Sequence, residues 1–152
     1  MSADGIGNSL TLAFLAHGRA ELQSLQLKNW LASIGVRAIL VEEEDDLGLS
    51  IIDKFEHYAR KCDVAFVFLT PDDRLLDQGH DLPKEVYIAR QNALVELGWF
   101  LRHLGRQAVI ILHQEGTTLP SDIEGILRLS FQRSVLETTE RIRRRLVGLE
   151  LL

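Results

Sequence analysis

The strongest constraint on the fold of this chain is a repeated switch between two spacings of its apolar residues. Five short apolar runs, rich in β-branched and aromatic residues, alternate with segments whose apolar residues recur at helical spacing. The runs are LTLAFLA (10–16), RAILV (37–41), VAFVFLT (64–70), AVIILH (108–113) and ILRLSF (126–131). Strands that lack alternating polar residues are typical of parallel sheets buried on both faces. The pattern therefore predicts an α/β fold in three layers, with a five-stranded parallel sheet and helices on both faces.

Helical spacing predicts four helices, over about residues 27–34, 51–59, 89–106 and 135–147. Gly35 follows the first helix and Gly105 lies at the end of the third, where a residue in the left-handed conformation is favoured. No internal repeat or linker divides the chain. We expect a single domain over residues 1–152, with a flexible segment at residues 1–9 and a core that needs no disulfide or metal.

Composition and charge exclude several classes of protein. The single cysteine, Cys62, excludes an intramolecular disulfide and fits a reducing compartment. No apolar stretch approaches the roughly 20 residues that cross a bilayer, and the N-terminus has no signal-peptide pattern. The net charge of −5 argues against general binding of nucleic acid, which depends on neutralising phosphates. We expect a cytoplasmic protein that binds neither membrane nor nucleic acid directly.

Polar residues follow the predicted strands. Ligands of open α/β sheets bind at the carboxyl ends of the strands, so these residues mark a candidate site at one rim of the sheet. They are His17, Gly18 and Arg19 after the first run, the acidic segment EEEDD (42–46) after the second, Thr70, Asp72 and Asp73 after the third, and the loop with Asp122 after the fourth.

Several common sites are absent from the sequence. There is no G-x-G-x-x-G after the first strand, no G-x-x-x-x-G-K-[ST] and no G-x-S-x-G. Dinucleotide-fold, P-loop and nucleophile-elbow sites are therefore excluded. The five histidines are too scattered for a metal site, so we expect no bound metal.

The predicted helix at 89–106 carries Glu96 between Val95 and Leu97, beside its apolar stripe. An ordinary explanation is that the carboxylate lies in water, or pairs with Arg102 or a neighbouring loop. The neighbours of Glu96 favour a functional role instead, because Asn92 and Trp99 share its helix face. We also take Gly98 to indicate close approach of another group, since glycine inside a helix costs about 1 kcal/mol relative to alanine.

Five blocks of this sequence resemble one known family. AFLAHGRAE, GLSIIDKFEHYA, VAFVFLTPDD, ARQNALVELGWFLRHLGR and LPSDIEGI are similar, in order and spacing, to the TIR-like domains of bacterial antiphage effectors. The resemblance covers residues 10–147. That family is described as predicted nucleotide-binding proteins and occurs fused to cyclic-nucleotide sensors. The resemblance implies a flavodoxin-like topology and cleavage of NAD+ at its nicotinamide–ribose bond, with NAD+ as substrate and no cofactor.

The resemblance also assigns residues. The catalytic glutamate of the family lies in the N-x-x-x-E-L-G block, which places it at Glu96. The blocks that line the pocket contain His17, Gly18, Arg19, Thr70, Asp72, Asp73, Arg90, Asn92, Trp99 and Asp122. The sequence departs from the family at Ala20, where an acidic residue is usual, and at Trp99, where tyrosine is commoner.

Cleavage of NAD+ needs only one carboxylate. Nicotinamide leaves as a neutral molecule, so the acid of an ordinary glycosidase is unnecessary, and an anion beneath the ribose stabilises the positive charge that develops there. Arg19 or Arg90 could bind the pyrophosphate, although a local salt bridge is an equal alternative for each.

The acidic segment has two interpretations. Five like charges in a row are typical of a mobile, solvated loop. The resemblance implies in addition that the loop at 42–49 joins subunits, so that activity requires a homo-oligomer and a fused or associated cyclic-nucleotide sensor. The alternative function is a TIR-like module that binds nucleotide or partner proteins without catalysis.

Overall fold

The computed structural model describes residues 9–79 and 84–152, and its centre is a five-stranded parallel sheet. The strands of this sheet are β1 (Leu12–Ala16), β2 (Arg37–Ile39), β3 (Val64–Leu69), β6 (Val109–Gln114) and β7 (Leu127–Phe131). Their order is β2-β1-β3-β6-β7, and every neighbouring pair is parallel, which confirms the predicted sheet. Because β2 and β3 lie on opposite sides of β1, the chain changes direction across the sheet between β1 and β3. Flavodoxin-like sheets bind their ligands at this switch point.

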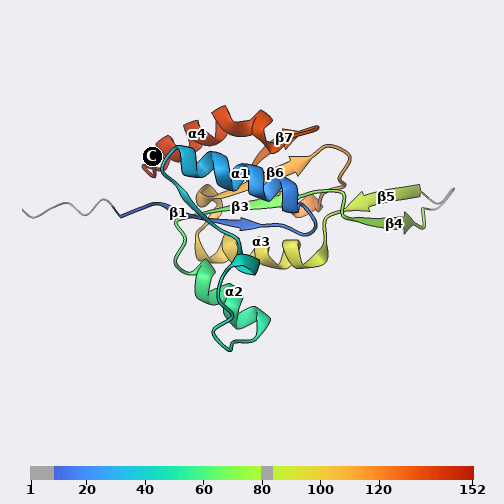
Figure 1. The fold of residues 1–152 in the computed structure, drawn as a ribbon. Coiled ribbons are helices and arrows are strands. Elements are labelled where there is room, and N and C mark those ends of the chain that lie inside the picture. The colour runs from blue at the N-terminus through green and yellow to red at the C-terminus, as the bar shows by residue number, and fades with distance from the viewer. Residues whose placement is uncertain (1–8, 80–83) are drawn as a thin grey trace, which may run out of the picture.

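In the described part of the chain, four α-helices cover the two faces of the sheet. They are α1 (Glu21–Ser33), α2 (Ile51–Ala59), α3 (Gln91–His103) and α4 (Thr139–Gly148). Helices α1 and α4 lie on one face, and α2 and α3 lie on the other, as Figure 1 shows. The predicted three layers are therefore confirmed. None of the helices in the described residues is long and apolar enough to cross a membrane.

Strand β3 shows why unbroken apolar runs predict this sheet. All six of its residues are buried, and successive side chains such as Phe66 and Val67 face opposite clusters of the core. On the α2 and α3 side, the ring centroid of Phe14 in β1 lies 5.3 Å from that of Phe55 and 5.0 Å from that of Phe100. These aromatic contacts hold α3 against β1 and fix where the polar side chains of α3 lie.

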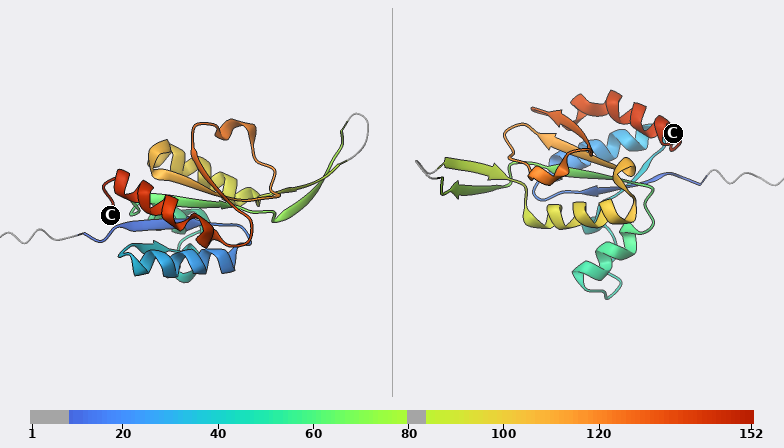
Figure 2. Two further views of the ribbon diagram at one scale, coloured as in Figure 1. Left: turned by 90° about the horizontal axis from the view of Figure 1, so that it is seen from above. Right: turned by 180° about the vertical axis from the view of Figure 1, so that it is seen from behind.

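A β-hairpin between β3 and α3 was not predicted. Strands β4 (Asp73–Asp77) and β5 (Lys84–Ile88) pair antiparallel and extend away from the sheet, as Figure 2 shows. The hairpin buries little surface, because Leu75 and Leu76 are 49% and 59% exposed, so it leaves no strong apolar pattern in the sequence. Its base is held by Thr118, whose backbone N–H donates to the Tyr87 carbonyl at 2.7 Å.

Other element boundaries differ by a few residues from those predicted. The last helix begins at Thr139, because Val135–Thr138 forms a 3-10 turn that starts from a capping box of Ser134 and Glu137. Gly35 and Gly105 have φ angles of +83° and +81°, which favour glycine, although the ψ angle of 161° at Gly105 is extended rather than left-handed helical. The segment 1–9 expected to be flexible lies outside the described residues, apart from Ser9.

Candidate functional site

Three segments that the sequence separates meet at the switch point of the sheet. They are the turn after β1 with His17 to Arg19, the turn after β3 with Thr70 to Asp73, and Arg90 directly before α3. Gly18 makes the meeting possible. A Cβ atom there would lie 2.2 Å from Asp72 Oδ2 and 2.7 Å from Arg90 Cβ, so only glycine fits without displacing the neighbouring chain.

Asp72 ties this rim together. Its Oδ1 accepts a hydrogen bond from the Thr70 hydroxyl at 2.5 Å, and its Oδ2 accepts one from the Arg90 backbone N–H at 3.1 Å. Asp72 thus binds the start of α3, where backbone N–H groups lack helical partners. Arg19 and Asp73 form an exposed ion pair at 3.5 Å, a kind of pair that contributes little to stability.

A hollow of about 340 Å³ opens on the α1 side of this rim. Its lining includes Arg19, Thr70, Asp72 and Gln114 together with the first turn of α1. The volume is at the lower end of the range for ligand sites. Glu96 is not among the residues that line this hollow.

Glu96 lies in the second turn of α3 and is partly buried. Burial raises the pKa of its carboxyl from 4.5 to about 7; the positive charge of His17 lowers it, and the negative charge of Glu42 raises it. A pairing with Arg102, the ordinary explanation for this glutamate, would instead lower the pKa. Near neutral pH the side chain is therefore about half ionised.

His17 binds Glu42, a residue of the acidic segment that sequence reasoning placed at the rim without singling it out. His17 Nε2 lies 2.5 Å from Glu42 Oε1, and the His17 side chain is 7% exposed, against 48% for that of Glu42. Burial alone lowers the pKa of His17, but the hydrogen bond to Glu42 and the charges of Glu42 and Glu21 outweigh it and place the pKa above its ordinary 6.5. The hydrogen bond to His17 lowers the pKa of Glu42 in turn.

The remaining residues that the sequence assigned to the site lie farther around α3. Asn92 is exposed in the first turn, one turn before Glu96. Trp99 is partly buried between α2 and α3, with its ring centroid 5.3 Å from that of Phe55 and 4.7 Å from that of His103. Asn92 therefore lies near the rim, whereas Trp99 packs between two helices.

The segment that carries Asp122 lies against a different side of α3 from the one that carries Glu96. Asp122 is exposed in a 3-10 turn (Ser121–Ile123), and the neighbouring Leu119 and Pro120 line a small hollow with Leu94. Leu94 and Glu96 are two residues apart on α3, which places them on nearly opposite sides of the helix.

No other part of the described chain approaches Gly98 closely. A Cβ at this position would meet no heavy atom within 4 Å among the described residues. Gly98 is two residues from Glu96 and therefore points away from the face that carries the carboxylate.

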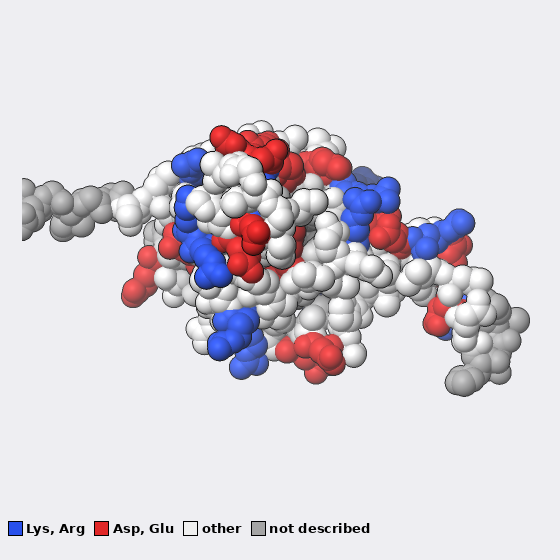
Figure 3. All heavy atoms as spheres, turned by 90° about the horizontal axis from the view of Figure 1, so that it is seen from below, with Lys and Arg blue, Asp and Glu red and all other residues white. Residues whose placement is uncertain are grey.

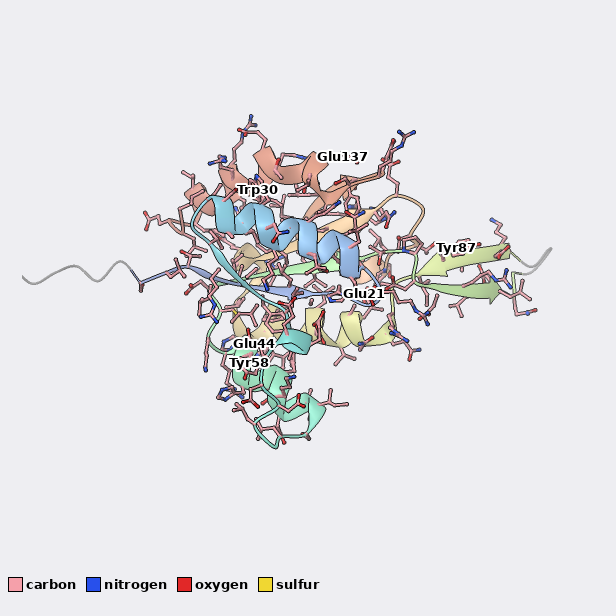
Figure 4. The ribbon with its side chains drawn as sticks, viewed as in Figure 1. Glu21, Trp30, Glu44, Tyr58, Tyr87 and Glu137 are labelled. Atoms are coloured by element: carbon pink, nitrogen blue, oxygen red, sulfur yellow. The ribbon has the colours of Figure 1, made fainter. Side chains whose placement is uncertain are left out.

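The acidic segment 42–46 makes several contacts with the rest of the chain, although its run of like charges is typical of a mobile loop. Glu42 binds His17, Glu43 binds Lys28, and Asp46 binds Lys54 at 2.6 Å. Where the segment meets α2, close to Glu44 in Figure 4, the Tyr58 hydroxyl donates to the Asp45 carbonyl at 2.8 Å. The expected solvated loop is exposed, but three of its carboxylates are paired with cationic or titratable side chains.

Possible metal ligands do not gather in this region. Among residues 9–79 and 84–152, no group of three or more His, Cys, Asp and Glu side chains is arranged to hold a metal ion.

Residues 13–133 match the family described as CAP12/Pycsar effector protein, TIR domain. The uncharacterized protein YuaY of Escherichia coli strain K12 is 35% identical over 116 residues, which are 75% of this chain and 38% of that protein. CD-NTase-associated protein 12 of Sphingobacterium faecium is 31% identical over 88 residues, 58% of this chain and 26% of that protein. Pycsar effector protein BcPycTIR of Burkholderia cepacia is 31% identical over 91 residues, 59% of this chain and 29% of that protein. The chain thus spans less than two fifths of the length of each of these relatives.

Proposed function

The chain belongs to the TIR-domain family of CAP12/Pycsar effector proteins, and from this premise we propose that it cleaves NAD+ at the nicotinamide–ribose bond. The observation that carries the proposal is Glu96, a partly buried carboxylate beside the switch point of the sheet, whose pKa is raised to about 7. Raised carboxyl pKa values at a ligand-binding rim are typical of functional sites. The balanced reaction joins NAD+ and water to give nicotinamide, ADP-ribose and a proton.

Glu96 supplies negative charge to the transition state. Nicotinamide departs with the bonding electron pair and becomes neutral, which leaves positive charge on the ribose. A partly desolvated carboxylate stabilises that charge more strongly than one in water, because the local dielectric is lower. Only the ionised form acts in this way, so the rate rises with pH through about 7.

Other residues at the rim would bind the substrate. The guanidinium groups of Arg19 and Arg90 are exposed near the hollow beside Thr70 and could contact the pyrophosphate with paired hydrogen bonds. His17 and Asn92 flank Glu96 and would contact the ribose. Asp72 and Gly18 shape the rim rather than bind substrate, because the Asp72 carboxylate is already engaged by Thr70 and Arg90.

Assembly would use the loop at 42–49 and the start of α2. Leu47, Leu49, Ile51 and Ile52 are exposed here, with Ile51 at 91%. Seen from the α2 and α3 side, charged side chains form separate groups with broad uncharged areas between them (Figure 3). Exposed apolar surface of this kind favours contact with another protein, and we assign it to a second copy of this chain. In the cell we place the chain in the cytoplasm, joined to or associated with a cyclic-nucleotide sensor in antiphage defence.

An assay for free nicotinamide tests the enzymatic function. Concentrated protein, with and without an agent that crowds protomers together, is incubated with NAD+ at about pH 8, where Glu96 is mostly ionised. Glu96→Gln should lose ~100-fold or more of the rate, because it removes the charge but preserves the shape of the side chain. An equal rate in this variant excludes the role given to Glu96.

The second candidate function is a module that binds nucleotide without cleaving it. The hollow beside Arg19 and Gln114 favours it, because Glu96 does not line that hollow. Tight binding of NAD+ with no nicotinamide released, under both conditions of the assay, would support the module.

A further inference from the structure

Glu42 lies next to His17 because of how two strands are paired. Strands β1 and β2 are parallel, and Phe14 is the register partner of Ile39. Three residues beyond this pair, the two chains reach His17 and Glu42. Both side chains therefore emerge at the same rim, and their hydrogen bond joins the edge strand to the switch point.

Every charged group that acts on this histidine comes from a different element. Glu42 belongs to the 3-10 turn Val41–Glu43 after β2, Glu21 starts α1 (Figure 4), and Glu96 projects from α3. Among the described residues the Glu42 side chain forms a hydrogen bond with the ring, the Gly18 backbone also acts on the ring and raises its pKa, and Lys54 of α2 acts on Glu42 in turn. The other ring nitrogen, His17 Nδ1, is buried and makes no hydrogen bond of normal geometry among the described residues, although the neighbouring Gly18 backbone acts on the ring.

We propose that Glu42 is a positioning residue of this site, which holds the His17 ring in place and cationic beside Glu96 through its hydrogen bond to Nε2. The inference rests on the proposed function, because it assigns Glu42 a part in the reaction. A carboxylate that binds one nitrogen of a histidine fixes the orientation of the ring, as in other sites where histidine acts on a neighbouring group. Glu42 itself touches neither substrate nor reacting atoms.

The consequence for Glu96 follows from two opposing effects. The cation of His17 lowers the pKa of Glu96, and the anion of Glu42 raises it by a smaller amount. Glu42→Gln removes the negative charge that raises the pKa of Glu96. It also removes the hydrogen bond that keeps the His17 ring cationic. The larger of the two effects is therefore lost, and ionisation of Glu96 should move to higher pH.

Glu43→Gln is a matched control. Glu43 follows Glu42 in the same 3-10 turn and pairs with Lys28 rather than with His17. Both variants remove one negative charge from the same turn and keep the size of the side chain. Only Glu42→Gln removes the charged partner of the histidine ring.

The first experiment follows His17 by NMR titration of protein with labelled histidine. The His17 signal is assigned by its absence in His17→Gln. In Glu42→Gln the His17 titration midpoint should move to lower pH, because the largest contributions that oppose the effect of burial, the hydrogen bond and charge of Glu42, are lost. Glu43→Gln should leave the midpoint unchanged. Equal midpoints in wild type and Glu42→Gln would overturn the inference, whether or not the chain cleaves NAD+.

The second experiment measures nicotinamide release as a function of pH. The acid limb of the profile, normalised to the maximal rate of each variant, should move to higher pH in Glu42→Gln and stay in place in Glu43→Gln. An acid limb of Glu42→Gln at the wild-type pH, or an equal shift in Glu43→Gln, would contradict the inference. If no variant and no wild-type protein releases nicotinamide, the proposed enzyme fails, and the NMR midpoints still decide whether Glu42 controls His17.

Discussion

Replacing Glu96 by glutamine should stabilise this protein at alkaline pH and leave its stability unchanged in acid. In the folded chain the carboxyl pKa is about 7, whereas its ordinary value is 4.5. Between these values the folded protein binds more protons than the unfolded chain does. Its free energy of unfolding therefore falls as pH rises through this window, and the loss is complete above about pH 7.

The size of the effect follows from the same pKa. Raising a carboxyl pKa from 4.5 to about 7 makes ionisation costlier by roughly 3 kcal/mol in the folded state. Glu96 is only partly buried, so solvent screening reduces the expected gain of Glu96→Gln to about 1–2 kcal/mol at pH 8. For a domain of this size the gain corresponds to an increase in Tm of roughly 3–6 °C.

Urea unfolding of wild type and Glu96→Gln at several pH values between about 4.5 and 8.5 measures the effect. Glu115→Gln serves as control for the removal of a carboxyl group, because Glu115 is exposed and directly follows β6. The reasoning fails if the difference in free energy of unfolding between wild type and Glu96→Gln is the same at every pH, or if the variant is less stable than wild type at pH 8. Many active-site residues lower the stability of the protein in exchange for activity. A variant that gains stability and loses NAD+ cleavage would show this trade-off at Glu96.

Four further variants test the fold, the site and the contact between copies. Gly18→Ala should lower the free energy of unfolding by about 1–3 kcal/mol, because its Cβ would lie 2.2 Å from Asp72 Oδ2, and urea titration measures the loss. Phe100→Ala removes a fully buried ring and should cost about 3–5 kcal/mol in the same titration, whereas Leu76→Ser in the exposed hairpin should change it by less than about 0.5 kcal/mol. Ile51→Ser should reduce self-association in sedimentation experiments without changing Tm, since Ile51 is 91% exposed; unaltered association would exclude this surface as the contact between copies.

The sheet could be predicted because its signal is local. A strand such as β3, with all six residues buried, must be apolar throughout, and its length and β-branched residues distinguish it from a helix. The hairpin of β4 and β5 has no such signal, since Leu75 and Leu76 are exposed and the strands pair only with each other. Prediction therefore succeeded where burial is complete and missed the element that buries least.

Local patterns predicted only those parts of the candidate site that lie within one element. Helical period alone placed Asn92 on the face of Glu96, and the same period turns Gly98 away from that face. Gly18 needs contacts with Asp72 and Arg90, which come from distant segments that no local pattern joins.

Glu42 shows which information the sequence lacked. The rule that ligands bind at the carboxyl ends of parallel strands brought the acidic segment to the correct rim, but five neighbouring carboxylates are equivalent in composition. What distinguishes Glu42 is the register of β2 against β1, in which Phe14 pairs with Ile39. A shift of one residue in that register would turn alternate side chains to the other face and would present Val41 or Glu43 to His17 instead. The role of Glu42 therefore depends on how β2 pairs with β1. For this reason Glu43→Gln, which changes the adjacent carboxylate, is the sharpest control for Glu42→Gln.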